Sequence, residues 1–327
     1  MENNWQKGIF DVVVGDALGE PVQFESRETV ATHPVKGMRG NGTFNLPKGS
    51  WTDDSSLTLA LLDAINKKDG IDLQYIMRNF VDWLDNGKFT PYGYSYDIGR
   101  GTILAIEAYK RSHNSDTCGG REEWNNGNGS LMRIIPACIY CCEKQLTDDE
   151  AVKVIHSVAS LTHGHIRANI ACGLYYFMVK EVIYGEGTLN ERLQKGLDNG
   201  FAYYEMILPD DNELSYFDRL RDLDKLAQTS VDDIKSSGYV VDTIEASIWS
   251  LVTTDSYKNA LLRAVNLGLD TDTIGAIAGG LAGLFYGIND DNGVPSSWIE
   301  DVQKNGMIEE MCRFADSRWN QHIVVKK

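Results

Sequence analysis

The most restrictive feature of this 327-residue chain is a segment, Ile274 to Ile288, in which glycine recurs at every fourth position. In a helix these glycines share one face, where the lack of side chains lets another backbone approach closely. Each glycine costs about 1 kcal/mol of helix propensity relative to alanine, so close packing must compensate. The fold is therefore expected to place a partner against the stripe formed by Gly275, Gly279, Gly283 and Gly287.

A transmembrane helix is the alternative interpretation, because small-residue stripes also mediate helix association in membranes. The apolar run is, however, shorter than the roughly 20 residues that a membrane span requires. Acidic residues bracket it, with Asp270 and Asp272 before it and Asp290 and Asp291 after it. The sequence thus favours a buried central helix and no membrane partner.

The composition allows one large domain and excludes a nucleic-acid surface. With 43% hydrophobic residues the chain can bury a substantial core, and no proline-rich or low-complexity segment divides it. We predict a single domain over residues 1–327, with a core at about 8–288 and a C-terminal helical extension at 289–327. The formal net charge of −16 argues against nucleic-acid binding, which needs a basic surface to neutralise phosphates.

The cysteines indicate the cellular compartment. None has the spacing of a zinc site, and several lie in helical apolar patterns, so we interpret them as reduced core thiols of a cytoplasmic protein. The first residues, Met1 to Asn4, lack the basic and apolar regions of a signal peptide, so secretion is not expected. The cysteines are Cys118, Cys138, Cys141, Cys142, Cys172 and Cys312.

Apolar residues recur at helical spacing along most of the chain, and no run of alternating β-branched residues is long enough to define a sheet. The predicted fold is all-α, a compact multi-helix domain. Residues 187–237 are the least periodic and are expected to hold only short helical pieces around Leu193 and Leu223. Longer helices are predicted at about 57–70, 73–87, 98–110, 148–161, 167–184 and 243–252, with a further one after Ser256.

Two short acidic segments carry the candidate chemistry. Asp270, Asp272 and Thr273 stand at the start of the glycine-rich helix, and Thr52-Asp53-Asp54 opens another predicted helix far upstream. Each segment alone is more typical of a helix cap, because Asp and Thr favour the positive end of a helix. Together they offer four carboxylates and two hydroxyls, enough oxygen ligands for two hard divalent cations. This prediction depends on the match of ligand types, because the sequence does not show that the segments meet.

Seven short motifs follow one another between about Gly8 and Gly287. They are Gly15-Asp16-Ala17-Leu18-Gly19, Trp51-Thr52-Asp53-Asp54, Tyr96-Asp97-Ile98-Gly99, Asn128-Gly129-Ser130-Leu131-Met132-Arg133, Thr162-His163-Gly164, Gly238-Tyr239-Val240 and Asp270-Thr271-Asp272-Thr273-Ile274-Gly275. In this order they resemble the ADP-ribosylglycohydrolases, a family that includes the dinitrogenase reductase activating glycohydrolase and ADP-ribosylarginine hydrolases. Each motif is weak alone, but the ordered set is specific.

The resemblance implies an all-α fold with a binuclear Mg²⁺ site, in which Mn²⁺ is possible. Catalytic roles are implied for Asp53, Asp54 and Asp97, of which Asp97 matches an acid near the anomeric carbon and the target side chain. Taken by itself, Asp97 also suits an N-cap of the helix predicted at Ile98, and the two roles are compatible. By motif match the metal ligands are Thr52, Asp53, Asp54, Asp270, Asp272 and Thr273.

Substrate-binding residues are also implied. Gly99–Thr102 would direct backbone N–H groups of a helix N-terminus at a diphosphate, and Asn128–Met132 matches a loop that wraps ADP-ribose. An Asn-Gly segment is equally typical of a simple turn. His163 matches a residue near ribose and phosphates, and Tyr239 one against adenine; alone they would be a helix-end histidine and a packed loop tyrosine. The implied set is Gln23, Gly99, Arg100, Gly101, Thr102, Asn128, Gly129, Ser130, Met132, His163 and Tyr239.

The sequence departs from the family pattern at two positions. Gln23 stands where many members have Glu, and an amide side chain can neither act as a base nor carry negative charge. Catalysis then depends on the metals and Asp97, or the protein binds ADP-ribose with little turnover. Leu269 replaces a common glycine, and its side chain need not face the metals.

We predict a hydrolase that removes ADP-ribose from ADP-ribosylated proteins by cleaving the N-glycosidic bond to the modified residue, expected to be arginine. The partner is then an ADP-ribosylated protein and the product is ADP-ribose. Three alternatives remain open: a non-catalytic ADP-ribose-binding protein, a hydrolase of another ADP-ribosyl linkage, and a structural protein built on the same fold.

Overall fold

The computed structural model describes residues 3–209, 212–288 and 291–319. These residues form α-helices and short 3-10 helices without a β-strand, so the all-α prediction is confirmed. The α-helices are α1 (Asn4–Gly19), α2 (Arg27–Thr32), α3 (Asp53–Lys68), α4 (Leu73–Asn86), α5 (Arg100–Ser112), α6 (Ile135–Glu143), α7 (Asp148–Ala159), α8 (Ile166–Tyr184), α9 (Leu189–Ile207), α10 (Leu223–Ala227), α11 (Val240–Val252), α12 (Tyr257–Val265), α13 (Thr271–Tyr286), α14 (Ser296–Asp301) and α15 (Asn305–Trp319).

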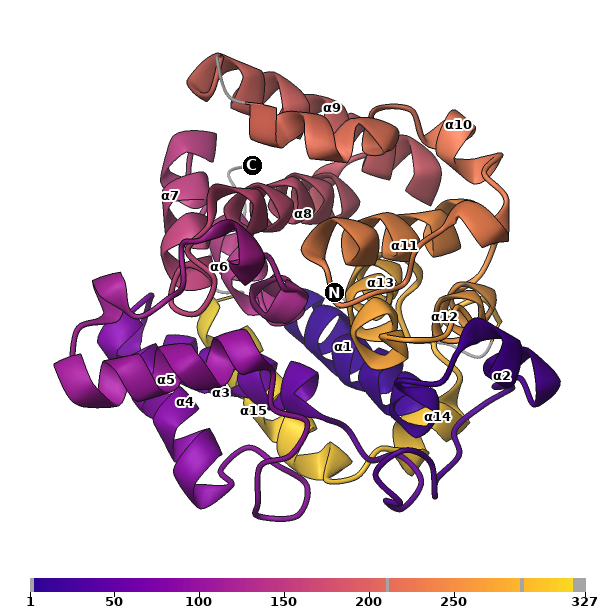
Figure 1. Cartoon of the computed structure of the whole chain (residues 1–327), viewed down its shortest axis with the longest axis horizontal. Coiled ribbons are helices and arrows are strands. Elements are labelled where there is room, and N and C mark those ends of the chain that lie inside the picture. The colour runs from indigo at the N-terminus through magenta and orange to yellow at the C-terminus, as the bar shows by residue number, and fades with distance from the viewer. Residues whose placement is uncertain (1–2, 210–211, 289–290, 320–327) are drawn as a thin grey trace.

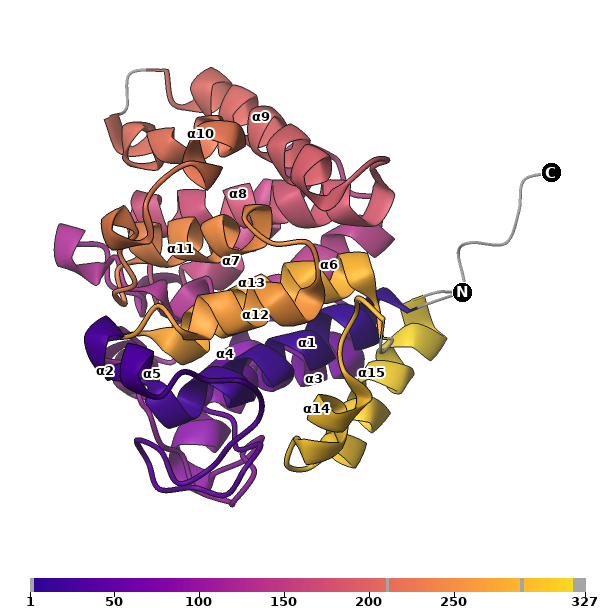
Figure 2. The ribbon, with the colours of Figure 1, turned by 90° about the vertical axis from the view of Figure 1, so that its right-hand side faces the viewer.

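Helices α1 and α13, which are far apart in the sequence, lie side by side at the centre of the molecule (Figures 1 and 2). They run antiparallel, because Gly19 at the end of α1 meets Thr271 at the start of α13, and Asp11 meets Gly279 and Gly283 further along. The remaining helices surround this pair, and their buried apolar side chains form one continuous cluster. The central pair therefore joins two segments that lie far apart in the sequence.

The glycine stripe is the surface through which the two central helices touch. A Cβ atom placed on Gly275 would lie 2.5 Å from the carbonyl oxygen of Gly15, and one on Gly279 would lie 2.2 Å from that of Asp11. The stripe continues on α1, where a Cβ on Gly15 would lie 2.0 Å from the carbonyl oxygen of Gly275. Such distances leave no room for a methyl group. The predicted close backbone approach is confirmed, and the partner is α1.

The membrane alternative for this segment finds no support in the described residues. Within them, no helix combines the length and the apolar character that crossing a membrane requires. All residues of α13 up to Leu284 are buried within the protein. Asp290, one of the bracketing acids, lies outside the described residues.

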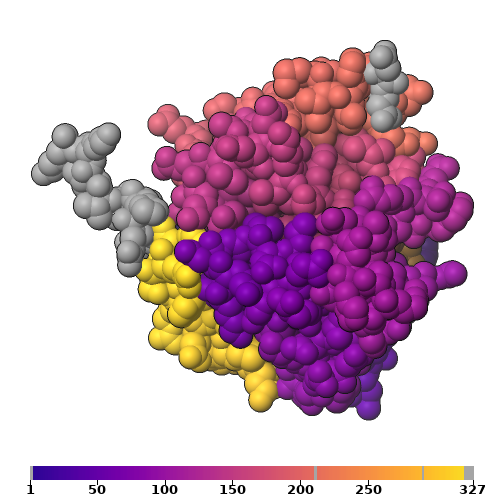
Figure 3. All heavy atoms as spheres, turned by 90° about the vertical axis from the view of Figure 1, so that its left-hand side faces the viewer, coloured from indigo at the N-terminus to yellow at the C-terminus, as the bar shows by residue number. Residues whose placement is uncertain are grey.

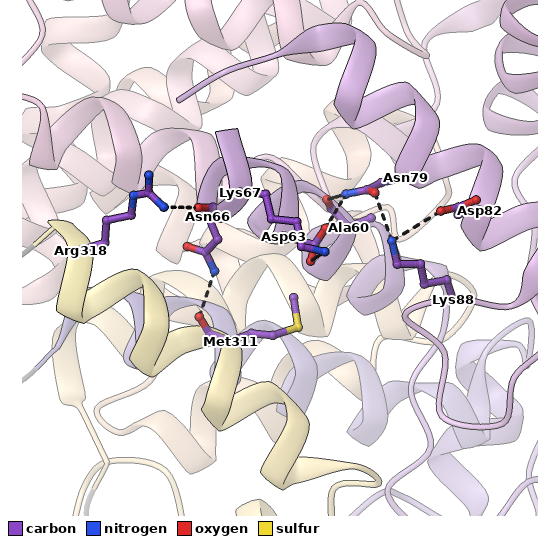
Figure 4. A network of polar contacts seen from close by, with 9 residues as sticks. All are labelled: Ala60, Asp63, Asn66, Lys67, Asn79, Asp82, Lys88, Met311 and Arg318. Carbon is purple, nitrogen blue, oxygen red and sulfur yellow. Dashed lines mark hydrogen bonds and ion pairs between the residues drawn. The ribbon is translucent and has the colours of Figure 1, made fainter. Parts of the chain in front are cut away.

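Polar contacts tie the second half of α3 to its neighbours (Figure 4). The Asn79 amide on α4 donates to the Ala60 carbonyl at 2.8 Å and to the Asp63 carboxylate at 3.0 Å. The Asn66 amide donates to the Met311 carbonyl of α15 at 3.1 Å. On the face drawn in Figure 3, the yellow C-terminal segment accordingly packs against the purple segment that contains α3 and α4. These contacts hold α3 against α4 and α15.

The largest error in the helix prediction concerns residues 187–237. A 19-residue helix, α9, occupies the part expected to hold only short pieces, and Thr188 begins it with a capping box to Glu191. Tertiary burial of Leu193, Leu197 and Phe201 supports it despite glycines in its sequence. Helices α1 and α6 were not predicted, because they are apolar on several faces. Helices α14 and α15 lie in the C-terminal extension that was predicted to be helical. The capping box of Thr147 and the cap at Ser256 are present as expected.

The cysteines are buried thiols, as predicted. All six are free and lie in the core. Burial raises the pKa of both Cys141 and Cys172 to about 12, so these groups stay protonated at neutral pH. They therefore act as small apolar side chains.

One buried acid of the central pair should make stability pH-dependent. Asp11 of α1 fills the space beside Gly283, and burial raises its pKa well above the ordinary value, opposed by the Tyr257 hydroxyl and the charge of Lys7. The folded protein thus retains a proton that the unfolded chain releases above about pH 4, so stability falls as the pH rises from there towards the folded-state pKa.

We therefore expect the free energy of unfolding of Asp11→Asn to decline less with rising pH than that of the wild type. The difference is at most about 1.4 kcal/mol per pH unit for one proton. Urea denaturation at a series of pH values measures it. Parallel curves for the two proteins would contradict the assignment of a retained proton to Asp11.

Candidate active site

The two acidic segments meet where α3 and α13 begin. The Thr52 hydroxyl lies 3.3 Å from the Asp54 carboxylate and 3.4 Å from the Asp272 carboxylate. From the other side, the Thr273 hydroxyl lies 3.3 Å from the Asp54 carboxylate. Segments separated by more than two hundred residues in the sequence thus share one cluster, which the sequence alone could not establish.

Neither segment acts as an ordinary helix cap. Thr52 is the N-cap residue of α3 and Asp270 that of α13, yet neither side chain accepts a hydrogen bond from a backbone N–H of its own helix. Asp270 instead accepts from the Asn128 amide at 2.5 Å and from the Thr273 hydroxyl at 3.4 Å. The capping alternative is therefore correct for the position of these residues but not for their side chains, which turn towards the cluster.

Asp16 of α1 supports the cluster from below, a role that was not predicted. Its carboxylate accepts from the backbone N–H groups of Thr52 at 2.9 Å and Ser55 at 3.0 Å, and from both hydroxyls. Asp16 thus accepts the backbone hydrogen bonds that an N-cap side chain would otherwise accept at the start of α3. Asp16 lies within the Gly-Asp-Ala-Leu-Gly motif, and its place in that motif was the sequence feature that could have indicated a role in the site.

The cluster concentrates negative charge away from water. Burial raises the pKa values of Asp53, Asp54 and Asp272 well above the ordinary value. Neighbouring carboxylates raise them further, Asp97 for Asp53 and Asp272, and Asp16 for Asp54. One carboxylate oxygen each of Asp54 and Asp272 is buried without a hydrogen-bond partner. Unpaired buried oxygens and mutual repulsion are the features that a bound cation would relieve.

The donor set suits hard cations, although the side chains as placed do not surround one. Within the described part of the chain, no three or more His, Cys, Asp and Glu side chains form a group able to hold a metal ion. The carboxylates instead bond to threonine hydroxyls, as described above. All the candidate ligands are oxygens, the donor type that Mg²⁺ and Mn²⁺ prefer.

A cavity of about 580 Å³ opens above the cluster. Most of the predicted site residues line it: Gln23, Asp53, Asp54, Asp97, Gly99, Arg100, Gly101, Thr102, Asn128, Gly129, Met132, His163, Asp270 and Thr273. Four others, Thr52, Ser130, Tyr239 and Asp272, are not among its lining residues. Of these, Thr52 and Asp272 lie in the cluster beneath it, through the contacts given above.

Asp97 lies at the wall of the cavity but does not cap α5. The prediction that Asp97 is the N-cap residue of this helix is therefore wrong. Helix α5 begins at Arg100 with Gly99 as its N-cap, and Asp97 has a positive φ of 52° that lies outside the helix. Its carboxylate accepts a hydrogen bond from the Gln23 amide at 2.8 Å. Gln23 therefore orients Asp97 without adding another negative charge.

Phe24 and Leu269, which adjoin Gln23 and Asp270 in the sequence, form a strained pair. Phe24 and Leu269 have positive φ values of 67° and 62°, a conformation that favours glycine. The Phe24 N–H donates to the Leu269 carbonyl at 2.7 Å, and the Leu269 N–H donates to the Glu25 carbonyl at 2.7 Å. The backbone geometry explains why glycine suits position 269, and the side chain is partly exposed rather than directed into the acidic cluster.

The mouth of the cavity has large apolar residues that the sequence interpretation did not single out. Trp124 is 82% exposed and lines the cavity together with Phe24 and Leu104. Tyr239, by contrast, turns its hydroxyl to Arg167, whose guanidinium donates to it at 3.1 Å. Tyr239 is thus not among the residues that line the cavity, and its contact with adenine stays a prediction.

Comparison with known proteins identifies the family. A model of the ADP-ribosylglycohydrolase family matches residues 9–323. The chain is similar to an ADP-ribosylarginine hydrolase from Pseudomonas putida, with 31% identity over 93% of this chain and 76% of that protein. It is also similar to the ADP-ribosyl-[dinitrogen reductase] glycohydrolase of Rhodospirillum rubrum, with 30% identity over 89% and 87%.

Solved structures agree with this assignment. The fold matches a chain from an "ADP-ribosylglycohydrolase-related protein complex" with a TM-score of 0.72 and 26% identity, covering 97% of both chains. The likeness thus extends over the fold as well as over the sequence. The chain belongs to the ADP-ribosylglycohydrolase family of hydrolytic enzymes.

Proposed function

We propose that this protein releases ADP-ribose from ADP-ribosylated proteins by hydrolysing the N-glycosidic bond between the ribose and a modified arginine. The observation that carries the proposal is the convergence of Asp53, Asp54, Asp270 and Asp272 at the base of a cavity large enough for a ligand. Arginine is chosen because similar proteins are named as ADP-ribosylarginine hydrolases. The free, buried thiols support a reducing compartment, for which we propose the cytoplasm.

We infer that two Mg²⁺ ions, replaceable by Mn²⁺, bind to the acidic cluster. The residues that would hold them are Thr52, Asp53, Asp54, Asp270, Asp272 and Thr273. The unpaired buried oxygens of Asp54 and Asp272 support this inference, because each leaves a lone pair available to a cation. Bound divalent cations would supply positive charge that stabilises negative charge developing on oxygen atoms during the reaction.

The protein's own residues have the remaining tasks. Asp97, held by the Gln23 amide, faces the cavity where it can exchange a proton with the leaving side chain or the attacking water. The N-terminus of α5 presents Gly99–Thr102 to the cavity, where backbone N–H groups and Arg100 favour a diphosphate. Asn128 holds Asp270 in place, while Gly129 beside it permits close approach of the substrate.

Gln23 favours one alternative, a protein that binds ADP-ribose with little turnover. We test both by incubating an arginine-ADP-ribosylated protein with the enzyme and Mg²⁺, then with a chelator. Release of ADP-ribose that stops on chelation is expected, because the cluster would lose its cations. Tight binding of ADP-ribose without any release would contradict the hydrolase assignment. Serine-linked and nucleic-acid-linked substrates in the same assay establish the bond specificity.

A further inference from the structure

A buried arginine without an acidic partner lies behind the substrate cavity. Arg133 is fully buried, and no carboxylate in the described residues forms an ion pair with it. Its guanidinium lies over the Phe80 ring at 4.8 Å, and two of its nitrogens contact the Val158 carbonyl at 3.4 Å each. Burial lowers its pKa to about 10, which still leaves it charged at neutral pH. A buried positive charge without a counter-anion is costly and calls for a compensating role.

Arg133 is joined to the cavity through a short chain of hydrogen bonds. Its Nη2 donates to the Thr162 hydroxyl oxygen at 2.6 Å, and this oxygen lies 2.8 Å from Nδ1 of His163. Arginine can only donate, so the Thr162 oxygen accepts from it and keeps its own hydrogen to give away. Thr162 is buried, and in the described residues its hydroxyl has two hydrogen-bond partners, Arg133 and Nδ1 of His163, of which only Nδ1 can accept. The hydroxyl therefore donates to Nδ1, because an unused buried donor would be costly.

This direction determines where the proton of the imidazole resides. If Nδ1 accepts, a neutral His163 must carry its hydrogen on Nε2. Burial, assisted by the charge of Arg133, lowers the pKa of His163 to about 3, so the ring is neutral at physiological pH. His163 therefore has a single N–H, and it is on the opposite side of the ring from Thr162.

The Nε2 side of the ring faces the cavity. His163 lines the cavity, and Cβ atoms placed on Gly101 and Gly127 would lie 2.8 and 3.4 Å from Nε2. A Cβ on Gly129 would lie 2.8 Å from the adjacent Cε1. Three glycines thus leave this edge of the imidazole uncovered. Gly101 belongs to the segment proposed above to contact a diphosphate, and Gly129 to the segment proposed to permit close approach of the substrate.

We propose that Arg133 and Thr162 are positioning residues that hold His163 in its Nε2–H form, so that it donates a hydrogen bond to a phosphate oxygen of ADP-ribose. The proposal rests on the proposed function for the identity of the ligand. It adds to that function the buried charge of Arg133 and the N–H group of His163, which together provide positive potential beside the acidic cluster. Because the donor is neutral and oriented in advance, little is spent on arranging it when the anion binds.

The first test observes the tautomer directly in the free protein. Protein labelled with ¹⁵N in histidine is studied by long-range ¹H–¹⁵N correlation spectra, and the His163 signals are assigned by their loss in His163→Gln. We expect Nε2 to be protonated and Nδ1 unprotonated in the wild type. Protonation at Nδ1 would overturn the proposal, whatever the protein binds.

The second test compares two substitutions at Thr162. Thr162→Val has nearly the same shape but cannot donate, whereas Thr162→Ser retains the hydroxyl. We expect Thr162→Val to lose the uniform Nε2–H form and to bind ADP-ribose, in the presence of Mg²⁺, about 10- to 100-fold more weakly in calorimetry. Thr162→Ser should stay within about threefold of the wild type in the same measurement. Thermal unfolding of both variants checks that each is folded.

The outcomes separate the relay from the function on which it rests. Equal ADP-ribose affinity and an unchanged Nε2–H signal in folded Thr162→Val would overturn the relay while leaving the hydrolase intact. A wild type that neither binds nor releases ADP-ribose would refute the proposed function and the ligand assigned here. Loss of affinity in Thr162→Val with rescue in Thr162→Ser supports the relay.

Discussion

Replacing Asp272 with alanine should lower kcat for ADP-ribose release by about 10²- to 10³-fold. Asp272 is completely buried in the acidic cluster, contacts the Thr52 hydroxyl, and leaves one oxygen unpaired. If it is a metal ligand, the variant loses the charge that holds a cation. Release of ADP-ribose from an arginine-ADP-ribosylated protein, followed at saturating substrate and Mg²⁺, measures the effect.

The same variant should respond differently to metal. Mg²⁺ stabilises only a folded state that binds it, so it should raise the melting temperature of the wild type more than that of Asp272→Ala. Without metal, Asp272→Ala should melt higher than the wild type, because one of several repelling buried carboxylates is gone. An equal Mg²⁺ effect on both proteins would show that the site has been placed wrongly.

A matched control comes from an acid at a distance from the cluster. Asp316 of α15 also has two buried oxygens without a hydrogen-bond partner, and burial raises its pKa to about 7. It lies near Glu143, which belongs to α6, and it does not line the cavity. Asp316→Ala should therefore keep the wild-type kcat and the wild-type response to Mg²⁺. This result would attribute the loss in Asp272→Ala to the site rather than to removal of a buried charge.

Gly275→Ala should destabilise the fold by about 3 kcal/mol or more, although alanine is the better helix former. The added Cβ would lie 2.5 Å from the Gly15 carbonyl oxygen, and neither backbone can move without separating α1 from α13. Because Gly19 and Thr271 of the same helix pair adjoin the acidic cluster, we also expect weaker binding of Mg²⁺. The free energy of unfolding is measured by urea denaturation.

Gly306→Ala is the matched control for this substitution. Gly306 lies in α15, and a Cβ placed there meets no atom within 4 Å. Helix propensity should then act alone, with a gain of up to about 1 kcal/mol. Opposite signs for the two variants would show that packing, and not propensity, decides the glycine stripe. Stabilisation by Gly275→Ala would refute the close contact of α1 and α13.

Local sequence patterns predicted the parts of the site that depend on local structure. The helices that carry Asp53 and Asp272 were predicted near their observed starts, because charges, caps and apolar spacing all act within a few residues. The motif order then indicated most of the residues that line the cavity. The assignment of metal and catalytic roles to them remains a prediction, tested by the variants above.

Other features depended on contacts between distant segments and could not be predicted in this way. Helix α9 packs against α8, and the two glycines within it, Gly196 and Gly200, lower its helix propensity. Asp97 was expected to cap α5, but its hydrogen bond to Gln23 and the later start of the helix are tertiary outcomes. Asp16 was part of a motif, yet its support of Thr52 and Ser55 requires α1 to lie beneath α3.

By itself, the sequence determined that Gly275, Gly279 and Gly283 needed a backbone partner, since only close packing can offset the propensity cost of a glycine-rich helix. It also determined the ligand types at Thr52–Asp54 and Asp270–Thr273. Only the tertiary structure decided that the partner is α1 and that the two acidic segments share one cluster. The physical reason is that helix periodicity and capping act over a few residues, whereas the meeting of chain segments depends on how whole faces pack.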